Sequence, residues 1–474
     1  MRLAAAKIQI PSCKLQGSSK LQIPAARCSC FIGRVFSLAA ICSLALDGMA
    51  AQSSRIPDQP TTNIYPIDLP SALRLAGAQN LDIKLARERV AEARANHAAA
   101  LAQFFPWLSP GITYRQHDNK LQGVEGNIID VHKNSYAPGA TIGAQVDVGD
   151  ALYKALAAKQ LASAAVHGLE AQRQGSVFAA AQGYFDLALA ANAVSVALES
   201  VRISRDYQGQ LEEAVNAGIA FKGDLLRIRV ELERNQLAAQ QAAEQQRIAA
   251  AVLAQVLRLD PAVDLIPSDP ELAPIALVGT NTGLHSLVQR AKFSRPEMKQ
   301  NHSFTAAARE AQTGAAYGPL IPSVGAQAFF GGLGGGRRGI SDTFGEQEDY
   351  AVGLSWRVGP GGLFDFTRTR AAEARVKISE LNEERLSDEV AREVVEAFAR
   401  WQSSAEQIQT VRRALAAAEE GLRLAQRRKE FAVGIVLENI QAEQDLARTR
   451  LDYLKAVTEF NKAQYALNKA VGNL

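Results

Sequence analysis

The chain has 474 residues, more than one compact core usually holds, so two units or one elongated architecture are expected. Its formal net charge is +3, and aromatic residues make up only 6% of it while alanine, glutamine, glutamate, arginine and leucine dominate long stretches. This composition suits extended helices that pack through small side chains and argues against a thick single core. We therefore predict a mainly α protein with a small β part.

Residues 1–50 are predicted to be a signal peptide. Val35–Leu46 form a short apolar run behind Arg27 and Arg34, and small residues follow at the expected cleavage position. The run is too short to cross a bilayer as a helix. All four cysteines lie in this leader, so the mature chain should need neither disulfides nor thiolate metal ligands. Lipid attachment at Cys42 is the alternative fate of this segment.

Removal of the leader, with its six Lys/Arg and one Asp, changes the formal net charge from +3 to −2. A mature surface without net basic charge argues against nucleic acid as a partner. No apolar run long enough to span a bilayer follows the leader. This excludes a transmembrane helix but leaves a transmembrane β-barrel open.

The first half begins with a polar, proline-containing linker at residues 51–68. A helix is predicted from Leu69 to Phe105, because apolar residues recur every three or four positions and Asp68 is placed to cap the first turn. A longer helix is predicted from Ala151 to Ala217. At 1.5 Å per residue it would be roughly 100 Å long, which predicts a rod or tube.

Between these helices, and again in the second half, apolar and polar residues alternate as they do in β-strands. The four predicted strands are Ile112–His117, Ala140–Val148, Val324–Phe330 and Tyr350–Val358. The segment Asn119–Asn134 and the glycine-rich run Gly331–Arg338 are predicted to be flexible hairpin tips and outer surface loops.

The chain reads as a duplication. Pro106 recurs as Pro322 and Gly218 recurs as Gly434, in both cases at an offset of 216 and in similar surroundings. A proline-rich linker at 261–279 separates the two repeats, which are predicted at 69–260 and 280–474. Each repeat is predicted to contain a helix, a β-hairpin, a long helix, a tight break and another long helix, the last one spanning about 437–471.

The alternating strands fit two arrangements: a sheet that covers a protein core, or a sheet with lipid on its apolar side and a watery lumen on the other. Export and aromatic residues near the strand ends favour lipid. The predicted interfacial aromatics are Trp107, Tyr136 and Trp356. The predicted pore-facing residues are Thr113, Arg115, Gln145, Asp147 and Arg357. These polar side chains either tune ion selectivity or are simply solvated.

Four strands cannot close into a membrane barrel, because open edges would leave unpaired backbone groups in hydrocarbon. Several chains must therefore share one barrel if the sheet enters lipid. Two copies would supply eight strands and three would supply twelve, and the pattern does not decide the number.

The order and duplication of these elements, from Leu69 to Leu474, resemble the TolC family of outer-membrane efflux and secretion channels. The resemblance implies a homotrimer with a twelve-stranded β-barrel in the outer membrane, continued by a periplasmic α-helical barrel. It further implies a passive exit duct of a tripartite efflux or type I secretion system, fed by an inner-membrane pump through a periplasmic adaptor.

In that family the glycine-centred breaks lie at the periplasmic tip, where adaptors dock. The matching residues here are Gly218, Ile219, Gly434 and Ile435. As a purely structural reading, both glycines are helix C-caps with positive φ. Asp224-Leu225-Leu226 resembles the family's Asp-Val/Leu-Leu run, although Asp224 is also a plausible capping residue. Because the same offset of 216 from Asp224 leads to Ile440, a ring of aspartates is not implied. The candidate aperture acids are Asp224, Glu438 and Glu443.

Nothing in the sequence predicts an enzyme. The six histidines lack metal-ligand spacing, and neither a Gly-x-Ser-x-Gly elbow nor a nucleotide-binding motif occurs. We predict no catalytic, cofactor or metal site. The competing interpretation is a periplasmic coiled-coil scaffold whose hairpins cap helices without entering lipid, which predicts a water-soluble protein.

Overall fold

The structure is a computed structural model that describes residues 64–269, 271–279, 283–337, 343–430 and 436–474. The chain divides into two units, Met1–Pro60 and Thr61–Leu474, and every described residue belongs to the second. The predicted signal peptide, its cysteines and most of the predicted linker 51–68 lie outside the described residues.

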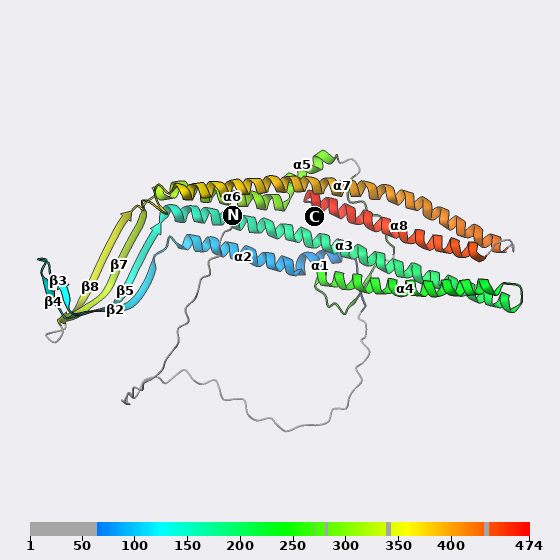
Figure 1. The fold of residues 1–474 in the computed structure, drawn as a ribbon, viewed down its shortest axis with the longest axis horizontal. Coiled ribbons are helices and arrows are strands. Elements are labelled where there is room, and N and C mark those ends of the chain that lie inside the picture. Colours follow the sequence, from blue (N-terminus) through cyan, green and yellow to red (C-terminus); the bar gives the residue numbers. More distant parts are fainter. Residues whose placement is uncertain (1–63, 270, 280–282, 338–342, 431–435) are drawn as a thin grey trace, which may run out of the picture. The chain divides into compact units, whose positions relative to one another are not determined.

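The same series of elements occurs twice in Thr61–Leu474 (Figure 1). The first series is α1 (Leu69–Gln79), α2 (Leu81–Ala102), β2 (Trp107–His117), β5 (Lys133–Asp147), α3 (Val148–Asn216) and α4 (Lys222–Leu257). The second is α5 (Leu284–Ser294), α6 (Pro296–Tyr317), β7 (Ser323–Arg337), β8 (Thr343–Ser355), α7 (Phe366–Glu430) and α8 (Val436–Val471). The prediction of a mainly α, duplicated fold with a small β part is confirmed.

The first helix of each series is in fact two helices. The predicted single helix Leu69–Phe105 is wrong, because Asn80 separates α1 from α2 and α2 ends at Ala102. The Asn80 side chain accepts a hydrogen bond from the Asp82 amide at 2.8 Å, which caps the first turn of α2. In the second series Pro296 starts α6 directly after the break. Asp68 is the N-cap of α1, but its side chain makes no capping hydrogen bond.

Four strands form one antiparallel sheet in the order β2-β5-β7-β8. The run Gly331–Arg338, predicted to be a flexible tip, instead lies in β7 as far as Arg337. Its glycines make room for aromatic rings from neighbouring strands. A Cβ at Gly332 would overlap the Phe344 ring, and one at Gly334 would overlap the Tyr136 ring.

Two further boundaries differ from prediction. Val148, predicted to end a strand, is the first residue of α3, so β5 runs directly into the long helix. The predicted loop Asn119–Asn134 contains a short hairpin, β3 (Lys120–Gln122) and β4 (Ile128–Asp130), which Lys120 and Asp130 close with an ion pair of 2.8 Å.

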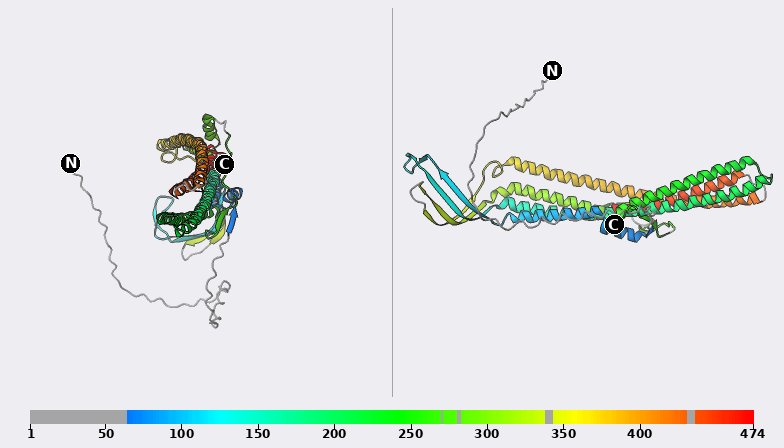
Figure 2. Two further views of the ribbon diagram at one scale, coloured as in Figure 1. Left: turned by 90° about the vertical axis from the view of Figure 1, so that its right-hand side faces the viewer. Right: turned by 90° about the horizontal axis from the view of Figure 1, so that it is seen from below.

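Helix α3 is continuous over 69 residues and so is roughly 100 Å long, as predicted. It joins the sheet at one end to the turn before α4 at the other. An 18-residue window of α3 reaches a mean hydropathy of 1.3, so α3 is long and apolar enough to cross a membrane. The sequence alone had excluded any transmembrane helix after the leader. Because α3 packs along its length against α2, α4, α6 and α8, we attribute this hydropathy to its alanine-rich packing surfaces. The helices of this unit lie side by side (Figure 2).

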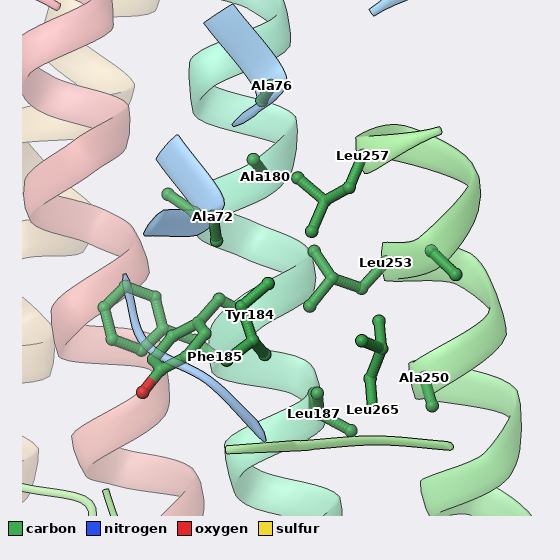
Figure 3. Packing of buried hydrophobic residues seen from close by; sticks show 13 residues of the cluster. Ala72, Ala76, Ala180, Tyr184, Phe185, Leu187, Ala250, Leu253, Leu257 and Leu265 are labelled. Atoms are coloured by element: carbon green, nitrogen blue, oxygen red, sulfur yellow. The ribbon is translucent and has the colours of Figure 1, made fainter. Parts of the chain in front are cut away.

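The main hydrophobic core lies where α1 crosses α3 and α4 (Figure 3). Small residues of α1, Ala72 and Ala76, let it approach α3 closely, and Leu253 of α4 points toward α3 in the same cluster. Tyr184 is buried in the same cluster, and its hydroxyl donates to Asp269 at 3.4 Å. Burial first, and the nearby Asp269 carboxylate second, raise the pKa of Tyr184 to about 12.

Both predicted linkers contain ordered structure that the sequence did not reveal. Strands β1 (Ile64–Ile67) and β6 (Asp264–Pro267) form a parallel pair. Further along the second linker, the extended chain binds two buried side chains of α8, Asn461 and Gln464. The Asn461 side chain accepts a hydrogen bond from one linker amide and donates one to a linker carbonyl, both at 2.9 Å. The Gln464 side chain accepts from the Leu277 amide at 2.6 Å. Hydrogen bonds therefore hold the second linker against α8.

The predicted spacing of 216 holds where β2 and β7 begin, at Trp107 and Ser323, but not for the last helix of each series. Helices α4 and α8 begin at Lys222 and Val436 and both have 36 residues, so their positions correspond at an offset of 214. Arg258 and Gly472, the next residues, both have left-handed φ values of 57° and 83°. Gly434 lies outside the described residues.

Candidate functional site

The sheet has two chemically different faces, because paired residues of antiparallel strands point to the same side. The polar face carries Thr113, Arg115, His117, Lys133, Ser135, Thr141, Gln145, Asp147, Ser323, Gln327, Gln347, Asp349 and Ser355. The apolar face carries Leu108, Ile112, Tyr114, Tyr136, Ile142, Val146, Val324, Phe330, Phe344, Tyr350, Val352 and Leu354. The alternation predicted for single strands therefore lines up across all four.

The structure brings four of the five predicted pore-facing residues to one side. Thr113, Arg115, Gln145 and Asp147 lie on the polar face, while Arg357 follows the end of β8. Two open hollows of about 550 Å³ each lie against this face; one is lined partly by Thr113 and Arg115, the other partly by Gln145. The Asp147 carboxylate accepts a hydrogen bond from the Ser323 hydroxyl at the helix end of the sheet.

The apolar face has no cover from the described part of the chain. Ile112 is 76% exposed and Val352 is 81% exposed. Two carboxylates, Glu346 and Glu348, interrupt this face towards the hairpin end of β8, and the Tyr350 hydroxyl donates to Glu348 at 3.2 Å. Strands β2 and β8 are the two edges of the sheet and have no further strand partner among the described residues. The sheet is thus open at both edges and on both faces.

The three predicted interfacial aromatics occupy different positions. Tyr136 lies on the apolar face, where its ring stacks on Phe344 with 6.0 Å between centroids. Trp356 follows β8 at the helix end and donates from Nε1 to the Leu320 carbonyl at 3.3 Å. Trp107 pairs with Gly143 and so falls on the polar side of the sheet, with its indole lying over that glycine.

The junction between β8 and α7 is organised by Asp365, which sequence reasoning did not identify. One carboxylate oxygen accepts from the Thr367 hydroxyl at 2.6 Å and from the Arg368 amide at 3.0 Å, and the other accepts from the Gly361 amide at 2.8 Å. Arg368 in turn pairs with Asp150 of α3 at 2.7 Å. The start of α7 is thereby fixed to the start of α3.

These hydrogen bonds, led by that from Thr367, lower the pKa of Asp365 from 3.8 to about 2. A lower pKa in the folded state means that ionised Asp365 stabilises the fold above about pH 4, and that this stabilisation is lost as the pH falls through 2. We expect Asp365→Asn to lower the thermal midpoint in detergent at pH 5 and to differ little from wild type at pH 2. A difference that is constant from pH 5 to pH 2 would contradict this assignment.

At the far end of α3 the chain reverses through an exposed turn. Gly218 has a φ of +76°, and the amide of Ile219 donates to the Ala214 carbonyl at 3.0 Å, which closes a Schellman C-cap as predicted for a glycine at this position. Ile219 is 81% exposed and Phe221, which the sequence analysis missed, is 72% exposed. Gly434 and Ile435, the residues predicted for the second turn, lie outside the described residues.

The acids near this turn divide into two kinds. Asp224 and Glu438 both lie in the first turn of a returning helix, at the shared offset of 214, and pair with Arg227 at 3.1 Å and Arg428 at 2.6 Å. The sequence comparison of Asp224 with Ile440 was therefore wrong, because the helix starts, and not the glycines, set the correspondence. Phe221, and not Asp224, is the N-cap of α4.

Glu443 lies deeper, in a cleft between the α3–α4 and α7–α8 hairpins that Ile203, Ile440 and Gln444 also line. Within the described residues no group of three or more His, Cys, Asp and Glu side chains could hold a metal ion. The site is therefore a set of surfaces: an amphipathic sheet with open edges, and a turn with exposed apolar side chains about 100 Å away.

Comparisons with known proteins give a consistent picture. The family model described as outer membrane efflux protein matches residues 72–257 and 287–473. The chain is 27% identical to Protein CyaE of Bordetella pertussis over 442 residues, which cover 91% of this chain and 89% of that protein. Among solved structures, a membrane protein from Pseudomonas aeruginosa is similar with a TM-score of 0.73 at 20% identity, covering 87% of this chain and 91% of that one. The CmeC outer membrane channel of Campylobacter jejuni is similar with a TM-score of 0.70 at 15% identity, covering 85% of each chain.

Proposed function

This chain belongs to the outer membrane efflux protein family, and on that basis we propose that three copies assemble into one duct that docks on a periplasmic adaptor and an inner-membrane pump. The protein is an exit duct of the outer membrane. What we propose beyond this is its assembly, its partners and the roles of individual residues, within either a tripartite efflux or a type I secretion system. Transport through it is passive.

The open sheet edges carry the proposal of a homotrimer. Strands β2 and β8 each expose one row of unpaired backbone groups, which hydrocarbon does not tolerate. Pairing β8 of one copy with β2 of the next would close a barrel of twelve strands from three copies, with the polar face towards the lumen. From Phe344 to Trp356, extended chain at a tilt of about 45° rises by about 28 Å, which matches an outer-membrane apolar band.

The helices supply a second argument from the duplication. Within one chain, α8 packs on α3, with Ile440 buried beside Tyr207. At the offset of 214 that relates α4 to α8, the counterpart of Ile440 is Leu226, which is 53% exposed. We propose that this α4 face packs on α7 of the next copy, which repeats the α3–α8 contact around the tube.

Cysteine crosslinking tests this arrangement on a clean background, because all four cysteines lie in residues 1–50. Ile203 and Gln444 line one cleft within the chain, and at the same offset their counterparts are Ala417 and Val230. We expect Val230→Cys/Ala417→Cys to give covalent trimers on non-reducing gels under mild oxidation. The matched pair Ile203→Cys/Gln444→Cys should crosslink within single chains and keep the mobility of a monomer.

Covalent dimers without trimers would rule out a closed ring built from this contact.

At the turn between α3 and α4, we propose that exposed Ile219 and Phe221, together with Gly218, form the docking surface for the adaptor, and that Gly434 and Ile435 do so before α8. Asp224 and Glu438 would then lie around the aperture. We further propose that residues 1–50 are removed on export and that 69–260 and 280–474 are the two repeats.

A further inference from the structure

The hairpin end of the polar face carries cations that nothing in the described chain neutralises. His117 and Lys133 are partners in the last pair of the β2–β5 ladder, and Arg115 lies one step further in, opposite Ser135. Arg115 and Lys133 are both exposed and form no ion pair with any residue that the structure describes. Two permanent positive charges thus lie close together on one face, at the end of the sheet farthest from the helices.

The nearby described carboxylates do not pair with Arg115 or Lys133, because they have other partners or lie elsewhere on the sheet. Asp130 pairs with Lys120 at 2.8 Å, and Asp118 pairs with His132 at 3.0 Å and accepts from Gln116. Asp349 lies deeper on the polar face and accepts from the Gln347 amide at 2.5 Å. Among the residues that the structure describes, the other acids at this end are Glu125, on the surface hairpin, and Glu346 and Glu348, on the apolar face.

We propose that Arg115 and Lys133 form an anion-attracting ring at the outer mouth of the duct, which makes anionic solutes the favoured class at the exit. The inference rests on the proposed function, because it requires the polar face to line the lumen of a trimer. Three copies place six such charges around one opening. A ring of like charges with low-dielectric walls raises the local concentration of counter-ions and favours their passage.

The test is ion selectivity in planar lipid bilayers. Purified trimers are reconstituted and the reversal potential is measured in a KCl gradient, which gives the permeability ratio of chloride to potassium. We expect Arg115→Glu/Lys133→Glu to lower this ratio by at least about threefold. The same comparison in 1 M salt should show a smaller change, because screening shortens the reach of the charges to about 3 Å.

The control carries the same change in net charge away from the sheet. Lys84→Glu/Arg87→Glu alters two exposed cations near the start of α2, at the end remote from β2, and should leave the ratio unchanged. Arg115→Gln/Lys133→Gln removes the charges without adding acids, so its permeability ratio should lie below that of wild type and above that of the double glutamate variant. It takes the place of the double glutamate variant if that variant does not assemble.

Normal unitary conductance with an unchanged ratio in both sheet variants would overturn the inference and leave the duct intact. If the wild-type protein forms no channels at all, the proposed trimeric pore fails, and this inference fails with it. The two failures are therefore separable in one set of recordings.

Discussion

Val352→Arg should prevent the protein from assembling stably in the outer membrane. Val352 lies on the apolar face of edge strand β8 and is 81% exposed. An arginine on the lipid face of a barrel costs about 2–4 kcal/mol near the bilayer midplane, and a trimer bears that cost three times. We expect the proposed trimer to be lost and the protein to leave the outer-membrane fraction.

Ala351→Arg is the matched control. Ala351 is the neighbouring residue, but it lies on the polar face beside both open hollows, so its side chain would point to water. This variant should assemble, with a reduced conductance as its main effect. If both variants behave alike, the sheet does not separate lipid from lumen. If wild type itself is fully soluble after washing, the scaffold interpretation is correct.

Gly149→Ala should destabilise the junction between the sheet and the helices. Gly149 lies in the first turn of α3, and a Cβ there would overlap the Gly318 carbonyl of the short 3₁₀ helix η1 (Gly318–Leu320). Both contacting groups are backbone, so neither can swing aside, and the junction must open to accept the methyl group. Overpacking of this kind costs about 1–3 kcal/mol, occasionally more.

The measurement is the temperature at which the proposed trimer dissociates in detergent, with Gly175→Ala as control. Gly175 lies in the same helix, but a Cβ there meets nothing within 4 Å. That change should be neutral or raise stability by about 1 kcal/mol, since alanine favours helix over glycine. A Gly149→Ala protein as stable as Gly175→Ala would show that the close approach of α3 to η1 is not needed.

Much of the fold could be predicted because the relevant signals are local. Period-two alternation in single strands identified β2, β5 and β8, and the apolar spacing of the last helix identified α8 almost to its ends. Gly218 could be placed as a C-cap because positive φ favours glycine. The predicted family, the outer-membrane location and the exit-duct function are confirmed by the comparisons.

The errors have physical causes that a sequence pattern does not display. Gly331–Arg338 reads as a flexible loop by composition, yet Gly332 and Gly334 lie under aromatic rings of adjacent strands, which only the register reveals. The break at Asn80 depends on a side-chain cap that an amphipathic pattern does not display. The spacing of 216, taken from two prolines and two glycines, holds at the start of β2 and β7, whereas α4 and α8 correspond at 214.

The sequence by itself determined where the long helices and the four main strands lie, that the chain is duplicated, and that the strands alternate between polar and apolar residues, because these properties follow from the order of neighbouring residues. Only the tertiary structure decided that all four strands share those two faces, that Arg115 lies beside Lys133, and that Asp224 corresponds to Glu438. Those relations depend on strand register and on where distant helices begin, and a linear pattern does not contain them.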